Sequence, residues 1–178
     1  MSEGDAILKK VISMEFYEAA TKVFKLDEGD GEPGKVGHPY RDSKGLWTIG
    51  RGHLIGEHLA DLRLSENIIE ELFKEDLAVA VREARLVVGS VFFESLPLAR
   101  QIALTSMLYT LGRNKFLKFE ETIEAMKRED WDEVAHRVLS AKWARDVDPR
   151  QRPGEGRDDR VAYMFKFGSF PSEYKIGE

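Results

Sequence analysis

The 178-residue sequence contains no cysteine, and this absence excludes several kinds of structure and chemistry together. A disulfide framework, a thiolate metal site and a thiol nucleophile all require that residue. The sequence also lacks any apolar run close to the roughly 20 residues that span a bilayer, so we expect no membrane-spanning segment. The acidic N-terminus, Met1–Asp5, lacks the basic and apolar regions of a secretory signal. We therefore expect any passage across a membrane to depend on another protein.

A basic excess is missing as well, because 32 acidic side chains outnumber 27 basic ones and the formal net charge is −5. The acidic excess lies in residues 1–80, whereas residues 81–178 are close to neutral. Nucleic-acid-binding proteins normally present a basic surface, so we expect no nucleic-acid partner. With 42% hydrophobic residues, the chain can nevertheless bury a sizeable core.

Hydrophobic spacing predicts that most of the chain is helical. Apolar residues three or four apart predict one helix at residues 6–27. A second helix is predicted from Ser65, as N-cap, to about residue 88, and its apolar positions on more than one side are typical of a connector between lobes. Beyond Gly89 we expect only helices: 98–111, 119–128, one that opens with a capping box at Asp130–Glu133, and 158–167.

Two glycine- and proline-rich segments interrupt this helical pattern. Residues 29–39 contain four glycines and two prolines and are predicted to form a loop, as is the shorter break at 148–156. Between them, residues 40–49 predict a β-hairpin, with a turn at Ser43–Gly45 and a strand rich in aromatic and β-branched residues. The predicted fold class is therefore α+β and mostly helical: a small hairpin lobe, a long helix and a larger helical lobe.

Glu28, Asp42 and Thr48 are the candidate catalytic residues. Two carboxyl groups facing one cleft are the minimum equipment for acid–base cleavage of a glycosidic bond. Desolvation between lobes would raise the pKa of Glu28 and make it the general acid, while Asp42 and Thr48 position a water. An inverting mechanism requires the two carboxyl groups to lie roughly 6.5–9.5 Å apart, and a separation near 5 Å would indicate retention.

Each of these residues also has an ordinary structural interpretation. Glutamates at helix ends are commonly solvated, and an aspartate in an Asp-x-x-Gly segment commonly begins a turn. His53 is one of four histidines, none with metal-ligand spacing, so we interpret it as a structural partner of a carboxylate. We expect no metal and no cofactor. Four aromatic residues at helical spacing are predicted to belong to the core rather than to a carbohydrate platform: Phe119, Trp131, Trp143 and Phe165.

The string Tyr40–Leu54, with Glu28-Gly29 before it, resembles the active-site signature of the T-even phage lysozymes, glycoside hydrolase family 24. Further matches occur in order at Leu72-Phe73-x-x-Asp76, Trp131-Asp132-Glu133, Trp143 and Arg160-Val161. The resemblance implies that Glu28 is the catalytic acid, Asp42 the catalytic aspartate and Thr48 the catalytic threonine. It also implies a structural His53–Asp76 pair and substrate contacts at four further positions: Leu54, Tyr109, Thr122 and Arg137.

The sequence departs from the family pattern in two loops. The interval from Glu28 to Asp42 is five residues longer than usual, which a loop accommodates at little entropic cost. A second insertion near residues 149–155 leaves two candidates, Arg150 and Arg157, for the arginine that the family pairs with its catalytic glutamate. We favour Arg157, because it keeps its spacing to Arg160. Thr110 also stands where the best-known member of the family has a glutamine that lines its cleft.

The resemblance implies a muramidase that hydrolyses the β-1,4 bond between N-acetylmuramic acid and N-acetylglucosamine in peptidoglycan, with inversion and without a metal. We expect a monomeric phage endolysin, present in the host cytoplasm before lysis, that reaches the cell wall through a separate membrane-permeabilising protein. Two alternatives are a non-catalytic peptidoglycan-binding or virion structural protein with this fold, and the killing domain of a bacteriocin. We expect one domain, 1–178, with four parts: an N-terminal helix packed on the helical lobe (1–28), the hairpin lobe (29–64), a connecting helix (65–88) and the helical lobe (89–178).

Overall fold

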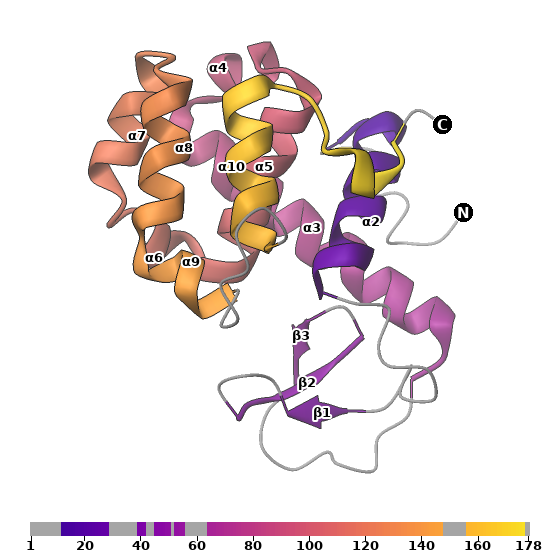
Figure 1. Cartoon of the computed structure of the whole chain (residues 1–178). Helices are drawn as coiled ribbons and strands as arrows, with labels where there is room; N and C mark the ends of the chain where they lie inside the picture. The colour runs from indigo at the N-terminus through magenta and orange to yellow at the C-terminus, as the bar shows by residue number, and fades with distance from the viewer. Residues whose placement is uncertain are drawn as a thin grey trace. The chain divides into compact units, whose positions relative to one another are not determined.

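The computed structural model describes residues 12–28, 39–41, 45–50, 52–55, 64–147 and 156–176, without the side chains of residues 27–28 and 145–147 (Figure 1). Its elements are α2 (Met14–Glu28), β1 (Tyr40–Arg41), β2 (Trp47–Ile49), β3 (His53–Leu54), α3 (Glu66–Val88), α4 (Ser90–Ser95), α5 (Leu98–Leu111), α6 (Arg113–Phe116), α7 (Glu120–Lys127), α8 (Trp131–Ser140), α9 (Lys142–Val147), α10 (Arg157–Phe167) and η1 (Ser172–Tyr174). The predicted class, α+β and mostly helical, is confirmed. Within the described ranges, no helix is both long and apolar enough to cross a membrane.

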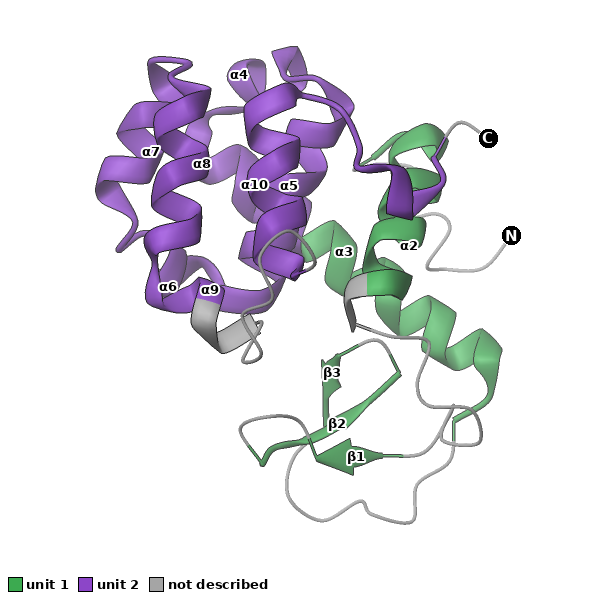
Figure 2. Cartoon of the chain, in the orientation of Figure 1, with its two compact units in different colours: residues 1–79 green, residues 80–178 purple. Residues whose placement is uncertain are grey.

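The chain divides into two compact units, residues 1–79 and 80–178 (Figure 2). The boundary falls inside α3, so the first half of this helix belongs to one unit and the second half to the other. The four-part division expected from the sequence stays a prediction.

Helix α2 begins later than the sequence pattern predicts. The helix starts at Met14, and the prediction that it extends back to residue 6 is wrong at Ile12 and Ser13, which are not helical. The cause is a local cap, because the Phe16 backbone amide donates a hydrogen bond to Ser13 Oγ at 3.1 Å. Apolar periodicity alone therefore placed the start of the helix too early, because it counted the capping residue Ser13 as helical.

Aromatic contacts pack α2 against the first half of α3. The Phe73 ring of α3 lies 5.6 Å from the Phe24 ring and 6.2 Å from the Tyr17 ring, both of α2 (centroid distances). Phe24 and Phe73 are fully buried, and the Tyr17 hydroxyl donates a hydrogen bond to the Glu70 carboxylate. The prediction that α3 is buried on several sides is wrong at Ile68 and Val79, which are exposed.

Three short strands form one antiparallel sheet in the order β1-β2-β3. The hairpin of β1 and β2 was predicted, whereas β3 was not, because two residues carry too little pattern to be recognised. Gly50 and Gly52 have positive φ (59° and 90°) in the connection to β3. A Cβ atom on Gly50 would lie 2.7 Å from Ile69 Cγ2, so the absence of a side chain there lets the sheet approach α3 closely.

In the second unit, α10 packs between α8 and α5, and α7 packs against α8 (Figure 1). The predicted helix ends are confirmed at α5, which Gly112 terminates with φ 70°, and at α8, where the Asp130 side chain accepts a hydrogen bond from the Glu133 amide. Arg100 of α5 stabilises the C-terminal end of α10, because its guanidinium donates to the Phe165 carbonyl at 2.8 Å.

The predicted core aromatics fall into two groups. Trp143 and Phe165 are buried as expected. Trp131 and Phe119 are half-buried. The Arg100 guanidinium lies 4.0 Å from the Trp131 ring centroid, and the Phe119 ring stacks on Phe116 at 5.9 Å. Short helices α4, α6 and α9 complete a segment that was expected to be helical throughout.

Candidate active site

Thr48 lies at the centre of the three-stranded sheet. It pairs with Tyr40 of β1 on one side and with Leu54 of β3 on the other. Side chains of directly opposed residues lie on the same face of an antiparallel sheet, so these three share a face. Thr48 is buried and its hydroxyl donates to the Leu46 carbonyl at 3.2 Å, whereas Leu54 is 57% exposed. The register thus brings together the predicted catalytic threonine and a predicted substrate contact.

The opposite face of the hairpin is stabilised by Arg41. Its guanidinium lies 4.5 Å from the Trp47 ring centroid, its cross-strand partner, and donates to the Gly45 carbonyl at 2.5 Å. Gly45 has a φ of 76°, a conformation that glycine adopts without strain. These contacts join Arg41 to Gly45 and Trp47, whereas Asp42 lies outside the described residues.

His53 and Asp76 form the pair that was predicted. His53 Nδ1 lies 2.8 Å from Asp76 Oδ2, and each side chain is about one-third exposed (31% and 33%). His53 is opposite Ile49 in the sheet, and Asp76 belongs to α3, so the contact attaches the sheet to that helix. The contact is observed, and its structural role stays a prediction.

Glu28 is the last residue of α2, as the sequence indicated, but its side chain is outside the described part of the structure. The distance between its carboxyl group and that of Asp42 therefore stays a prediction. Arg150 also lies outside the described residues.

In the second unit, two predicted substrate contacts line one pocket. Thr122 of α7 and Arg137 of α8 lie beside a cavity of about 400 Å³ between these helices. Thr122 is buried, and Arg137 is held by two carboxylates. Its Nε lies 2.6 Å from Glu133 Oε1, and its Nη1 contacts Glu121. The cavity therefore combines a fixed guanidinium with acidic and hydroxyl groups, a lining suited to a polar ligand.

Arg157 opens α10 and is buried. Its Nη2 donates hydrogen bonds to Thr110 Oγ1 at 2.8 Å and to Ser106 Oγ at 3.1 Å. Both hydroxyls belong to α5, one turn apart, and Thr110 Oγ1 itself donates to the Ser106 carbonyl at 2.9 Å. Two neutral acceptors thus orient the guanidinium. The sequence singled out Arg157 and Thr110 separately, and the structure brings them together.

Ser106 is the residue that sequence reasoning missed. It is fully buried in an apolar helix, four residues before Thr110. A pair of hydroxyls at this spacing lies on one helix face and could have indicated a polar partner. Tyr109, a further predicted substrate contact, lies beside Thr110 on α5 and is half-buried.

The sequence is similar to known lysozymes. The family model described as phage lysozyme matches residues 32–155. "Probable T4-type lysozyme 2" of Dictyostelium discoideum is 28% identical over 176 residues, which cover 86% of this chain and 96% of that protein. "Probable T4-type lysozyme 1" of the same organism is 28% identical over 171 residues, with 83% and 93% covered. The chain therefore belongs to the phage lysozyme family and is a glycoside hydrolase of the lysozyme type.

Proposed function

We propose that the protein is a muramidase, which hydrolyses the β-1,4 bond between N-acetylmuramic acid and N-acetylglucosamine in peptidoglycan. The observation that carries this proposal is the strand register, in which Thr48 lies between Tyr40 and the exposed Leu54. The family match covers this sheet and the pocket of Thr122 and Arg137, since both fall within residues 32–155.

In the proposed reaction, Glu28 protonates the glycosidic oxygen as its bond to the anomeric carbon breaks. A water attacks that carbon from the opposite face of the sugar and gives its proton to Asp42, so the configuration inverts. Side chains alternate along a strand, and an extended chain beyond Arg41 would bring Asp42 to the face of Thr48. The buried Thr48 hydroxyl donates to Leu46, so its oxygen lone pairs can accept a hydrogen bond from the attacking water.

Arg157 is proposed to face the Glu28 carboxylate in the active enzyme. A guanidinium stabilises a carboxylate once the proton has been transferred. Its bonds to Ser106 and Thr110 already fix its orientation, which lowers the entropy lost when it meets a carboxylate.

The first test is loss of peptidoglycan turbidity with the variant Glu28→Gln. We expect its rate to fall at least about 100-fold, because general acid catalysis contributes roughly 10²–10⁴-fold. Glu18→Gln is the matched control, since Glu18 is an exposed glutamate on the same helix and should retain full activity. A folded Glu28→Gln variant with full activity would remove Glu28 from the acid role. An inactive parent protein would support the non-catalytic alternative instead.

The second test identifies the bond and the stereochemistry. Mass spectrometry of digested peptidoglycan should find reducing N-acetylmuramic acid ends, and anhydro ends would indicate a transglycosylase. Proton NMR during early turnover should detect the α-anomer first if the reaction inverts. A β-anomer as first product would contradict the roles given to Asp42 and Thr48.

We further propose that the protein acts as a monomeric endolysin in host cell lysis, that it resides in the host cytoplasm beforehand, and that a membrane-permeabilising protein gives it access to the wall. The proposal rests on the family match and on the sequence features described above. Expression with and without such a protein tests it: lysis should require both, and lysis by the enzyme alone would contradict this requirement.

A further inference from the structure

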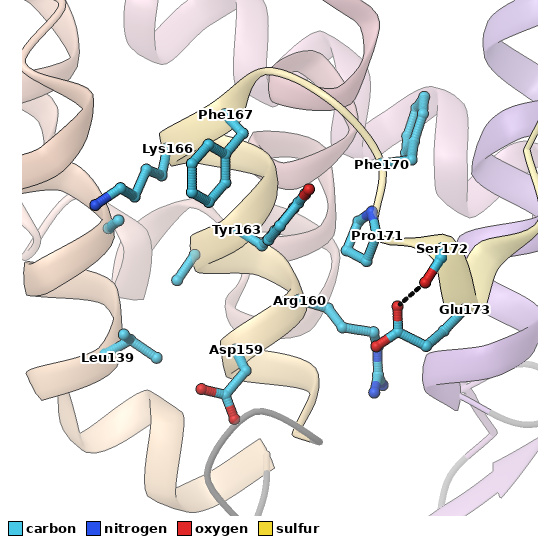
Figure 3. Close-up of a pocket in the computed structure, with 12 residues that line it drawn as sticks. Leu139, Asp159, Arg160, Tyr163, Lys166, Phe167, Phe170, Pro171, Ser172 and Glu173 are labelled. Atoms are coloured by element: carbon cyan, nitrogen blue, oxygen red, sulfur yellow. Dashed lines mark hydrogen bonds between the residues drawn. The ribbon is translucent and has the colours of Figure 1, made fainter.

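A second cavity lies on the helical surface of the same unit and shares no residue with the pocket of Thr122 and Arg137. This groove, called here the α10 groove, has a volume of about 530 Å³. Figure 3 shows its apolar side chains on α8, on α10 and on the segment after α10. They are Leu139, Tyr163, Phe167, Phe170 and Pro171. The volume falls within the roughly 300–1,000 Å³ of ligand sites, and an apolar lining with few polar groups is typical of them.

Two aromatic rings of the α10 groove are exposed to solvent. Tyr163 is 40% and Phe167 57% exposed, one helical turn apart on α10. Their ring centroids lie 4.6 Å apart at an interplanar angle of 47°, so each ring limits the movement of the other. In Figure 3, Tyr163 projects from α10 toward the segment that carries Phe170 and Pro171. Exposed apolar surface of this kind commonly marks an interaction site.

The charges around the α10 groove are balanced. Two basic and two acidic residues line it: Asp159, Arg160, Lys166 and Glu173. Lys166 Nζ lies 2.8 Å from Asp132 Oδ1, and Arg160 Nε donates to the Tyr174 hydroxyl at 3.2 Å. A neutral lining offers little attraction to nucleic acid or to an anionic lipid surface. It is complementary to an uncharged occupant that carries hydroxyl groups for Asp159 and Glu173.

We propose that the α10 groove binds an uncharged N-acetylhexosamine segment of a glycan strand, as a second attachment point on the polymer that the active site cleaves. The apolar face of a pyranose ring packs on Tyr163 and Phe167, while its hydroxyls reach the neighbouring carboxylates. This inference rests on the proposed function for the identity of the polymer. Two attachment points on one strand make the second contact intramolecular and raise avidity without tighter binding at either point.

The net charge of the chain explains why an uncharged attachment would help the protein bind the cell wall. A chain with net charge −5 gains no net ionic attraction to an anionic cell wall, so contacts that salt does not screen would strengthen its adhesion. An aromatic platform supplies such contacts, and its contribution is expected to be independent of ionic strength.

The test measures retention of the full chain on chitin, an insoluble uncharged polymer of β-1,4-linked N-acetylglucosamine without muramic acid or peptides. The double variant Tyr163→Ala/Phe167→Ser is compared with Leu86→Ser, which changes an apolar residue of 63% exposure on α3. We expect the double variant to lose at least about 5-fold in retention, and the control to bind like the parent. The aromatic exchange Tyr163→Phe/Phe167→Tyr should retain binding, and urea unfolding confirms that all variants are folded.

Three results would overturn the inference: equal retention of the double variant and the parent, loss of retention between about 50 and 500 mM salt, or a parent dimer that the double variant converts to a monomer. The last result would assign the groove to a second copy of the chain. Because chitin lacks the bond that a muramidase cleaves, retention of the protein on chitin tests the groove even if the protein proves inactive. On insoluble peptidoglycan, the double variant should raise KM about 5-fold with kcat unchanged, whereas failure of the proposed function would appear as an inactive parent.

Discussion

Replacement of Thr110 by valine tests how Arg157 is held. The valine keeps the volume of threonine but removes the hydroxyl that accepts a hydrogen bond from Arg157 Nη2 at 2.8 Å. Hydrogen bonds to charged groups contribute about 1.5–3 kcal/mol, and Ser106 Oγ at 3.1 Å remains as an acceptor for the same nitrogen. We therefore expect the lower limit, a loss of about 1.5 kcal/mol in the free energy of unfolding. For a domain of this size the corresponding fall in Tm is about 3–6 °C.

Thr105→Val is the matched control on the same helix. Thr105 is fully buried, and its hydroxyl donates to the Gln101 carbonyl at 2.8 Å, so the change removes only a neutral hydrogen bond within α5. Its expected cost is about 1 kcal/mol or less. Urea unfolding monitored by circular dichroism gives both values, and the difference between the two variants isolates the contact with the guanidinium.

A double-mutant cycle with Arg157→Met completes this test. If Thr110 stabilises the protein through Arg157, the valine substitution should cost about 1 kcal/mol less in the methionine background. Equal costs in both backgrounds would refute the reasoning. So would a Thr110→Val variant that is no less stable than Thr105→Val.

Three further predictions concern the first unit. Gly50→Ala should lower the free energy of unfolding by about 1–3 kcal/mol, because a new Cβ would lie 2.7 Å from Ile69 Cγ2 and the φ of this residue is positive. Gly45→Ala should lower it by only about 1 kcal/mol, because φ is positive there too but no atom lies within 4 Å of a new Cβ. Equal losses in the two variants would contradict the steric argument. Burial raises the pKa of Glu70, so the contribution of this carboxyl group to stability is present below the ordinary pKa of 4.5 and is lost as pH rises through the raised pKa. The variant Glu70→Gln should therefore gain stability relative to the parent between acidic and neutral pH. Parallel curves of stability against pH for the two proteins would contradict this prediction. Asp76→Asn should cost about 1 kcal/mol or less, because the pair with His53 is one-third exposed, and a cost above about 3 kcal/mol would indicate a larger role.

The local elements could be predicted because their causes lie within a few residues of sequence. Gly112 ends α5 and Asp130 begins α8 through contacts with their immediate neighbours. The hairpin follows in the same way from the turn chemistry around Gly45. Where a local cause was overlooked, as with the Ser13 cap of α2, the predicted boundary was wrong although the information was present.

The sequence by itself also determined which residue types are available for chemistry, because Glu28, Asp42, Thr48 and the absence of cysteine do not depend on folding. Only the tertiary structure decided which hydroxyls hold Arg157, since Ser106 lies 51 positions away in the chain. The same holds for the α10 groove, whose surface depends on how α8, α10 and the segment after it pack. Short-range interactions are encoded by spacing, whereas contacts between distant segments depend on which apolar faces bury one another, and periodicity does not specify those partners.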